Sequence, residues 1–245
     1  MDRGLWITWY DLPEARREAY LDWCHREYLP ALLKRPGILW AAHYASVERS
    51  ERPVTTREHI AKRCTDPVVP TGDRYILLVG AGDPVVFGNP APNAYNAALP
   101  AADREMLALR IGERMSLTTE ITRVEGPAAK DYTEGMLPAP CLQVGSYNCT
   151  WQQEEEMHAW YTQWRMRAMA TLPGCVRTRR LASVAGWAKH GVLYEFVSLE
   201  MRNEYFLKHE LADPEMKAWS DRFVRNLMHA PRGSYLARRL WAALA

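Results

Sequence analysis

The sequence predicts an α+β protein in which two units, each with the element order β-α-β-β-α-β, pack their sheets together. Three observations predict this class. The chain repeats itself, both halves show the same order of strand-like and helix-like segments, and either unit alone would leave one sheet face uncovered. The length of 245 residues is sufficient for two such units.

The repeat appears when the sequence is compared with itself at a shift of 137 residues. Residues 5–47 then match residues 142–184 without a gap, and the matched positions share a tryptophan, Trp23 and Trp160, and a Pro-Gly pair. Farther along the chain the shift falls to 115 residues. The first half therefore carries about 22 additional residues between its second and third strands.

Proline and glycine residues punctuate residues 126–140, which predicts a linker between the two units. We therefore divide the chain into a first half, residues 1–128, and a second half, residues 139–245.

The elements of the first half follow in order. Residues 5–10 are aromatic or β-branched and predict a strand. Pro13 is well placed to open a long helix, and Pro36-Gly37 ends it near residue 35. The remaining elements are strands at residues 38–47, 75–79 and 117–124 and a second helix at residues 101–111.

The second half repeats this order, with Pro173-Gly174 ending its first helix. Its strands are expected at residues 142–149, 176–184, 192–199 and near 234–240, and its second helix at residues 215–228. This element order is that of the ferredoxin-like unit, so the two halves are expected to form one pseudo-symmetric barrel.

A resemblance to a known group supports this fold. The run Trp-Cys-His-Arg-Glu-Tyr-Leu-Pro at residues 23–30, the Arg-Pro-Gly-Ile that follows at 35–38, and a strand with Tyr44 resemble the EthD-like group of dimeric α+β barrel proteins. Leu-Tyr-Glu-Phe at 193–196 is similar to that group as well. The resemblance covers both halves and implies a tandem fusion.

The wider superfamily implies small-molecule chemistry. It includes cofactor-independent monooxygenases, lactone isomerases, dehydratases or lyases of aromatic degradation, and haem enzymes. The EthD-like group commonly has a histidine two residues before the helix proline. This chain has Tyr28 at that place, and Arg165 in the second half.

Composition excludes several classes of protein. A net charge of +2 is far from the basic excess of nucleic-acid binders, and no apolar stretch is long enough to span a membrane. Five cysteines with no C-x-x-C pair argue against a disulfide framework and a zinc ribbon. The first four residues are followed directly by an aromatic, strand-like segment rather than by the apolar core of a signal peptide. We therefore expect a reduced, cytoplasmic protein, either a monomer or a homodimer of the tandem unit, that binds a small molecule.

Cofactor motifs are also missing from the sequence, so we expect no metal, flavin or nicotinamide. Gly80-Ala81-Gly82 follows a strand, but Val85 stands where a dinucleotide fingerprint needs its third glycine. Glu154 and His158 are spaced as two ligands on one helix face could be, although a solvated face explains them as well. A haem ligand, His158 or His209, remains an alternative.

The candidate site residues come from positions where the two halves differ. The alignment of the two halves pairs five aromatic or imidazole residues of the first half, Trp6, His25, Tyr28, Trp40 and His43, with Gln143, Thr162, Arg165, Arg177 and Arg180 of the second, in that order. The rings and imidazoles favour the first half, so we expect the main cavity between its sheet and first helix. His25 would be the acid or base, Tyr28 or Tyr10 a hydrogen-bond donor, and Trp6 and Trp40 the walls. A structural role for each histidine is the alternative.

Three further features bear on this site. Period-two alternation places Trp40 and His43 on opposite faces of their strand. Pro30 either kinks its helix and opens a cleft beside His25, or marks a place where the helix ends and restarts. The long insertions at residues 48–72 and 83–100 are expected to be irregular binding loops or lids.

Glu195 is an acidic residue on an apolar strand face. It is either a general base or the partner of Arg177, Arg179 or Arg180 in a structural ion pair. From across the barrel, Arg177 and Arg180 could also hold a substrate carboxylate or phenolate.

The sequence thus predicts a cofactor-independent lyase, isomerase or dehydratase that transfers protons on a small hydrophobic molecule, and we expect that molecule to be aromatic. A cofactor-free monooxygenase and a non-catalytic small-molecule-binding accessory protein are the alternatives.

Overall fold

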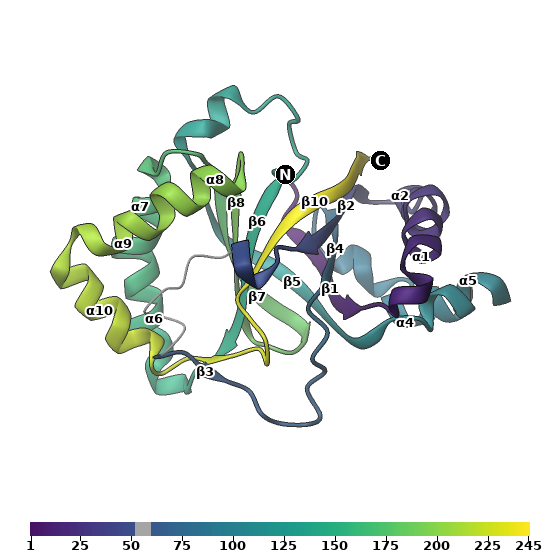
Figure 1. Ribbon diagram of the computed structural model, residues 1–245, viewed down its shortest axis with the longest axis horizontal. Coiled ribbons are helices and arrows are strands. Elements are labelled where there is room, and N and C mark those ends of the chain that lie inside the picture. The colour runs from purple at the N-terminus through teal and green to yellow at the C-terminus, as the bar shows by residue number, and fades with distance from the viewer. Residues whose placement is uncertain (52–59) are drawn as a thin grey trace.

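A closed barrel of eight antiparallel strands forms the centre of the computed structural model, which describes residues 1–51 and 60–245 (Figure 1). Around the barrel the strands follow the order β10-β2-β4-β1-β5-β7-β8-β6, and β6 pairs with β10 to close it. Their bounds are β1 Gly4–Asp11, β2 Ile38–Ser46, β4 Tyr75–Ala81, β5 Ile111–Glu125, β6 Cys141–Asn148, β7 Cys175–Gly186, β8 His190–Phe196 and β10 Tyr235–Leu244.

Each half contributes four neighbouring strands in the same topological order. In the first half the order is β2-β4-β1-β5, and in the second half it is β7-β8-β6-β10. The two sets join where β5 pairs with β7 and where β10 pairs with β2. The expected α+β barrel is therefore confirmed. The origin of its halves in a tandem repeat stays a prediction.

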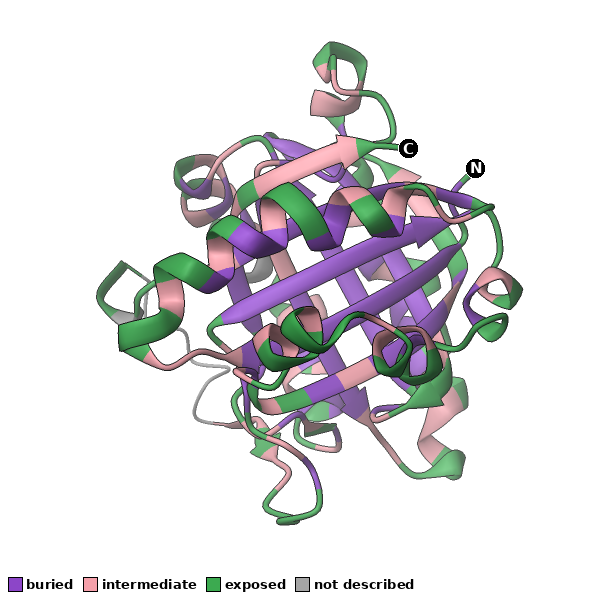
Figure 2. Ribbon diagram, turned by 90° about the vertical axis from the view of Figure 1, so that its right-hand side faces the viewer, coloured by how far each residue is buried: buried purple, intermediate pink, exposed green. Residues whose placement is uncertain are grey.

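Each half packs its helices against the outer face of its own strands. The helices of the first half and those of the second half lie on opposite sides of the barrel (Figure 1). In the first half they are α1 Arg17–Trp23, α2 Leu29–Leu33, α4 Pro92–Ala97 and α5 Ala101–Leu107. In the second half they are α6 Glu154–Trp160, α7 Met166–Thr171, α8 Leu199–Met201, α9 Leu207–Ala212 and α10 Pro214–Val224. Figure 2 shows the buried strands beneath the helices of the first half.

Shorter elements complete the structure. Single 3₁₀ turns occur at Glu14–Arg16, Arg49–Glu51, Pro84–Gly88, Pro127–Asp131 and Trp151–Gln153. The two-residue strands β9 (Met228–His229) and β3 (Lys62–Arg63) extend the sheet beyond β6. The insertion at residues 83–100 is thus not irregular, since a 3₁₀ turn and α4 occupy most of it. Of the insertion at residues 48–72, residues 52–59 lie outside the described part of the chain.

The helix neither ends nor restarts at Pro30. A π-helical turn, Cys24–Tyr28, joins α1 to α2, and the backbone stays helical through it. The second half has the same π-helical turn at Tyr161–Arg165, where the residue equivalent to Pro30 is Arg167. Because the turn recurs without a proline, Pro30 is not its cause.

Three apolar clusters hold the fold together. One fills the barrel and includes Ile7, Trp9 and Trp40, whereas the other two lie between each half's sheet and its helices. Alternation along β1 explains the split, because Trp6 and Tyr10 face the helices while Ile7 and Trp9 face the interior.

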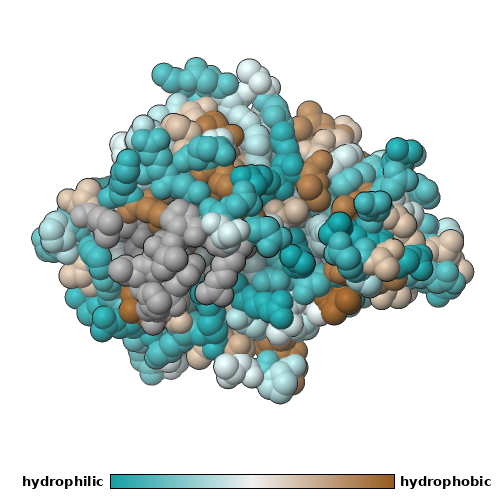
Figure 3. Space-filling view, viewed as in Figure 1, coloured by the Kyte–Doolittle hydropathy of each residue, from teal (hydrophilic) through white to brown (hydrophobic). Residues whose placement is uncertain are grey.

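Hydrophilic residues cover most of the face shown in Figure 3. On the face shown in Figure 3, hydrophobic atoms form small, separate patches. Among the described residues, no helix combines the length and the apolar character needed to cross a membrane.

Candidate functional site

A cavity of about 660 Å³ lies between the sheet of the second half and its helices. Its floor is formed by Gln143, Gly145 and Tyr147 of β6, together with residues of β8 and β10. The two π-helical turns of the second half, Tyr161–Arg165 and Arg202–Phe206, contribute to its walls. Residues from the first half, among them Arg63 and Arg74, line its rim.

The expected location of the main cavity, in the first half, is therefore wrong. None of the nine residues that the sequence singled out is among its lining residues. The cause lies in β1 and β6, where Trp6 and Thr8 of the first half correspond to Gln143 and Gly145 of the second. An amide and a bare backbone occupy less volume than an indole and a threonine side chain, so the second half keeps a space that the first half fills.

Arg165 is a buried cation in the wall of this cavity. Its side chain closes the π-helical turn after α6 and is 1% exposed. Its Nε donates a hydrogen bond to the hydroxyl of Tyr194 at 2.9 Å, and its guanidinium carbon lies 4.6 Å from the ring centre of Phe206 and 5.6 Å from that of Trp160. Such a setting holds the guanidinium in one position.

His209 fixes the other edge of Arg165. Its Nδ1 lies 2.6 Å from the carbonyl oxygen of Phe206, which can only accept, so Nδ1 carries a proton. Its Nε2 then accepts from Nη1 of Arg165 at 3.2 Å. His209 therefore meets Arg165 as a neutral imidazole.

A second arginine, Arg202, comes from the other π-helical turn. Its Nε and Nη2 both donate to Oε1 of Gln143, at 2.9 and 2.5 Å. The side chain is 7% exposed. Isolated π-helical turns frequently occur at functional sites, and here each of the two in this half places an arginine at the cavity.

Two tyrosine hydroxyls, from Tyr147 on the floor and Tyr161 in the wall, supply hydrogen-bonding groups to the cavity. The hydroxyls of Tyr147 and Tyr161 lie 2.5 Å apart. Burial raises the pKa of Tyr147, and it raises the pKa of Tyr161 well above the ordinary value for a tyrosine. Both phenols therefore keep their protons at neutral pH. His229 is the imidazole among the described lining residues, and its ring centre lies 5.7 Å from that of Tyr147.

The charges of the lining favour an anionic ligand. Among the described residues, five arginines and two carboxylates line the cavity. The two carboxylates belong to ion pairs with exposed arginines at the rim, Glu48 with Arg74 at 3.1 Å and Asp73 with Arg232 at 3.3 Å. The buried arginines, Arg165 and Arg202, stand deeper, where low dielectric strengthens their field.

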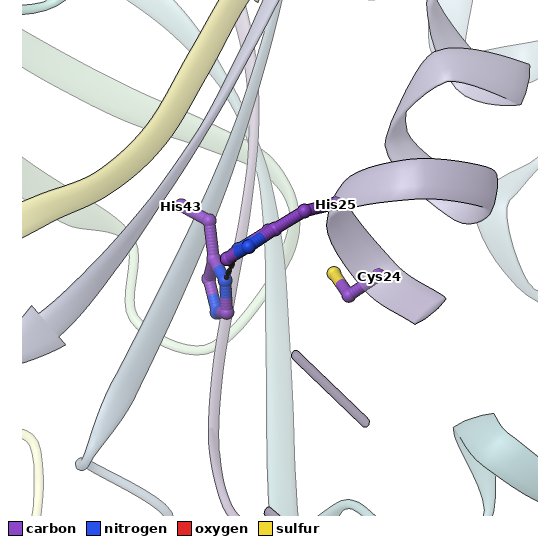
Figure 4. Close-up of side chains that lie close together, drawn as sticks. All are labelled: Cys24, His25 and His43. Carbon is purple, nitrogen blue, oxygen red and sulfur yellow. Dashed lines mark hydrogen bonds between the residues drawn. The ribbon is translucent and has the colours of Figure 1, made fainter. Parts of the chain in front are cut away.

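The structure brings three residues predicted for the first half together, but in a packed layer. The Tyr10 hydroxyl lies 2.7 Å from Nε2 of His43, and Nδ1 of His43 lies 2.8 Å from Nε2 of His25 (Figure 4). Burial lowers the pKa of both imidazoles, and that of His43 well below its ordinary value. Half-buried His25 stacks on Trp241, with ring centres 6.0 Å apart.

The other residues predicted there have structural partners. Trp6 donates to Oγ1 of Thr8 at 2.9 Å, and Tyr28 donates to Oδ1 of Asn96 at 2.9 Å. Trp40 faces the barrel interior, opposite to His43 as alternation predicts, and donates to Oδ2 of Asp2 at 2.8 Å.

Glu195 belongs to a buried ion-pair network. Its carboxylate oxygens lie 3.2 Å from Nε of Arg179 and 3.5 Å from Nε of Arg177, and one also accepts from the backbone N–H of Ala139. The structure thus favours the ion-pair interpretation over the general base. Arg180 is not part of this network, because it donates to Nδ1 of His158 at 2.7 Å.

The residues considered for a metal or haem do not fit those roles. Glu154 contacts Lys189 and His190, whereas His158 is exposed and held by Arg180, so the two do not form one ligand pair. His209 has both ring nitrogens engaged, as described above. Neither His158 nor His209 lines the cavity.

No model of a known protein family matches this sequence, and no curated protein is similar to it. Solved structures do share its fold. An anthrone oxidase-like protein has a TM-score of 0.64 and 9% identity, with 100% of this chain and 93% of that chain covered. A proposed monooxygenase from Fusobacterium nucleatum subsp. nucleatum has a TM-score of 0.58 and 9% identity, with 99% and 94% covered.

A third neighbour is a proposed chlorite dismutase, TA0507, with a TM-score of 0.55 and 14% identity over 98% of this chain and 96% of that chain. At these identities the likeness establishes the dimeric α+β barrel fold alone. Membership of the EthD-like group stays a prediction.

Proposed function

We propose that the cavity of the second half is the active site of an enzyme that binds a small aromatic acid, phenol or enol and transfers protons on its anion. The observation that carries this proposal is the pair of buried arginines, Arg165 and Arg202, beside tyrosine hydroxyls in a chamber with aromatic walls. The volume of about 660 Å³ is within the range of small-molecule sites.

The arginines would stabilise negative charge that develops on the substrate. A guanidinium held by Tyr194 and His209 is already oriented, so it needs no reorganisation when a phenolate or enolate forms. This lowers the pKa of a bound phenol or carbon acid. In this proposal His229, whose ring lies beside that of Tyr147, would take the proton, and the hydroxyls of Tyr147 and Tyr161 would donate hydrogen bonds.

The same anion suits a second candidate function. An electron-rich phenolate or enolate can react with dioxygen, so a cofactor-free oxygenase would need the same stabilisation. The names of two neighbours, an anthrone oxidase-like protein and a proposed monooxygenase, are the reason for keeping this candidate beside the first. A binding protein without turnover is the remaining possibility, and the experiment below distinguishes all three.

The test uses the full-length protein and a panel of hydroxyarenes and enolisable ketones that includes anthrone. Binding is followed by tryptophan fluorescence, oxygen uptake with an electrode, and products by mass spectrometry. Oxygen uptake indicates the oxygenase, and product formation without uptake indicates lyase or isomerase chemistry. Saturable binding without turnover would contradict the proposal that the protein is an enzyme. Binding that Arg165→Met leaves unchanged would contradict the proposal that this cavity is the active site.

A further inference from the structure

We infer that Cys24, His25 and His43 form a binding site for a transition-metal ion of the Zn²⁺ type. Their ligand atoms, one thiol sulfur and two imidazole nitrogens, all lie within 4.8 Å of one another. The three residues come from two elements that pack together, the π-helical turn Cys24–Tyr28 and strand β2 (Figure 4). None of them lines the cavity described above, so this site is separate from the proposed active site.

The π-helical turn explains how consecutive residues face one ion. In a regular α-helix, neighbouring side chains point about 100° apart, so Cys24 and His25 would diverge. A π-helical turn is wider, which reduces the angle between successive side chains. In the structure both side chains lie on the side of the helix that faces His43 (Figure 4).

The donor atoms suit a borderline-soft metal. Thiolate and imidazole are the ligands that Zn²⁺ prefers in proteins, at about 2.0–2.3 Å. The two facing nitrogens, Nε2 of His25 and Nδ1 of His43, now share a hydrogen bond of 2.8 Å. A metal ion would replace the shared proton and require the nitrogens to separate by a fraction of an ångström. His25 can make this movement because it is only half-buried.

The surroundings of His43 resemble the outer shell of a metal ligand. With Nδ1 directed at the ion, Nε2 carries the proton and donates to the Tyr10 hydroxyl 2.7 Å away, which fixes the ring. Burial raises the pKa of the Cys24 thiol to about 12, and the guanidinium of Arg110, packed over the Tyr10 ring, opposes that rise.

A second cluster in the chain provides a matched control. Cys149, Glu154 and His190 also lie within 4.8 Å of one another. There, however, the Lys189 ammonium lies 2.5 Å from the Glu154 carboxylate and competes with a cation for it. We therefore expect the first cluster to bind more tightly.

Cobalt(II) is the probe, because it substitutes for Zn²⁺ and its bond to a thiolate gives a charge-transfer band in the near ultraviolet. Full-length protein, treated with chelator and reductant, is titrated with Co²⁺ and then with Zn²⁺. We expect one Co²⁺ per chain, a thiolate band, and displacement by Zn²⁺. Absence of the band at saturating Co²⁺ would refute the site.

Variants assign the band to its cysteine. Cys24→Ser should abolish it, and His25→Asn, at a half-buried position, should weaken Co²⁺ binding at least about 10-fold. Cys149→Ser should leave the band and the affinity unchanged. A band that survives Cys24→Ser but disappears in Cys149→Ser would overturn the proposal. Circular dichroism confirms that each variant is folded, and if Cys24→Ser does not fold, His25→Asn decides.

Discussion

The helix-to-sheet layers of the two halves share a backbone plan but differ in what fills them. In both halves the side chains of the first strand point alternately toward the helices and toward the barrel interior. The helix that packs on this strand contains a π-helical turn at the equivalent position in each half. In the first half, Trp6 and Tyr28 complete a packed layer of rings with internal hydrogen bonds. In the second half, Gln143 and Arg165 stand at those positions beside a cavity of about 660 Å³. The comparison teaches that side-chain volume, not topology, decides which half keeps a cavity.

The largest expected effect is on stability, because the Trp6 side chain is packed in a buried layer whereas the equivalent Gln143 lies beside a cavity. Trp6→Ala would leave a large void in a buried layer and lower the free energy of unfolding by about 3–5 kcal/mol. The equivalent Gln143→Ala loses only a contact to Arg202, about 1–2 kcal/mol. Urea unfolding of both variants checks this. Equal losses would mean that the two layers are packed alike.

The second expected effect is on chemistry. Arg165→Met keeps much of the side-chain volume but removes the charge. Removing a preoriented donor of this kind should lower kcat/KM about 100-fold or more. Tyr28→Phe changes the equivalent position of the first half and should leave kcat/KM within about 2-fold while costing about 1 kcal/mol of stability. A Tyr28→Phe enzyme as impaired as Arg165→Met would move the active site to the first half.

A substitution that makes the second half more like the first should close the cavity. In Gln143→Trp the indole would occupy the space beside Arg202, and we expect ligand affinity to fall at least about 10-fold, or about 1.4 kcal/mol. Fluorescence titration measures the affinity, and the unfolding midpoint shows whether the fold is intact. Unchanged affinity in a folded variant would place the ligand elsewhere.

The smallest expected effect is on the pH dependence of stability. It arises at His190 of the second half, because the aligned residue of the first half is Tyr75, which has no imidazole. Burial lowers the pKa of His190 in the folded protein, so the unfolded chain binds the proton more tightly. Stability is therefore present above the unfolded pKa of about 6.5 and decreases as pH falls below it, by at most about 1.4 kcal/mol per pH unit. In chelator-treated protein, His190→Gln should reduce this slope between pH 7 and 5. An unchanged slope would contradict the assignment.

Local sequence signals predicted the fold well because they depend on neighbouring residues. The Pro-Gly pairs ended helices where expected, and alternation correctly placed Trp40 and His43 on opposite faces of β2. The closed barrel followed from two sheets that each needed a partner. Less local features were missed: β5 begins at Ile111, six residues before its expected start, because pairing with β1 extends it.

For the site, the sequence determined which residues differ between the halves, but not which difference leaves space. Gln143 and Arg165 were visible as polar replacements for rings, and Gly145 as a missing side chain was a further signal. Aromatic residues drew the prediction to the first half instead. Those rings pack on one another there, because a buried indole or phenol is most stable when its whole surface is in contact.

Tertiary structure alone decided which of these side chains meet. Arg202 and His229 reach the cavity from segments far from β6 in sequence, and neither had a motif to mark it. Likewise, Cys24 and His25 have no ligand spacing with His43, since a strand and a helix place them together only after folding. Periodicity and breakers act over a few residues, whereas a void or a cluster of ligands is a property of packed surfaces.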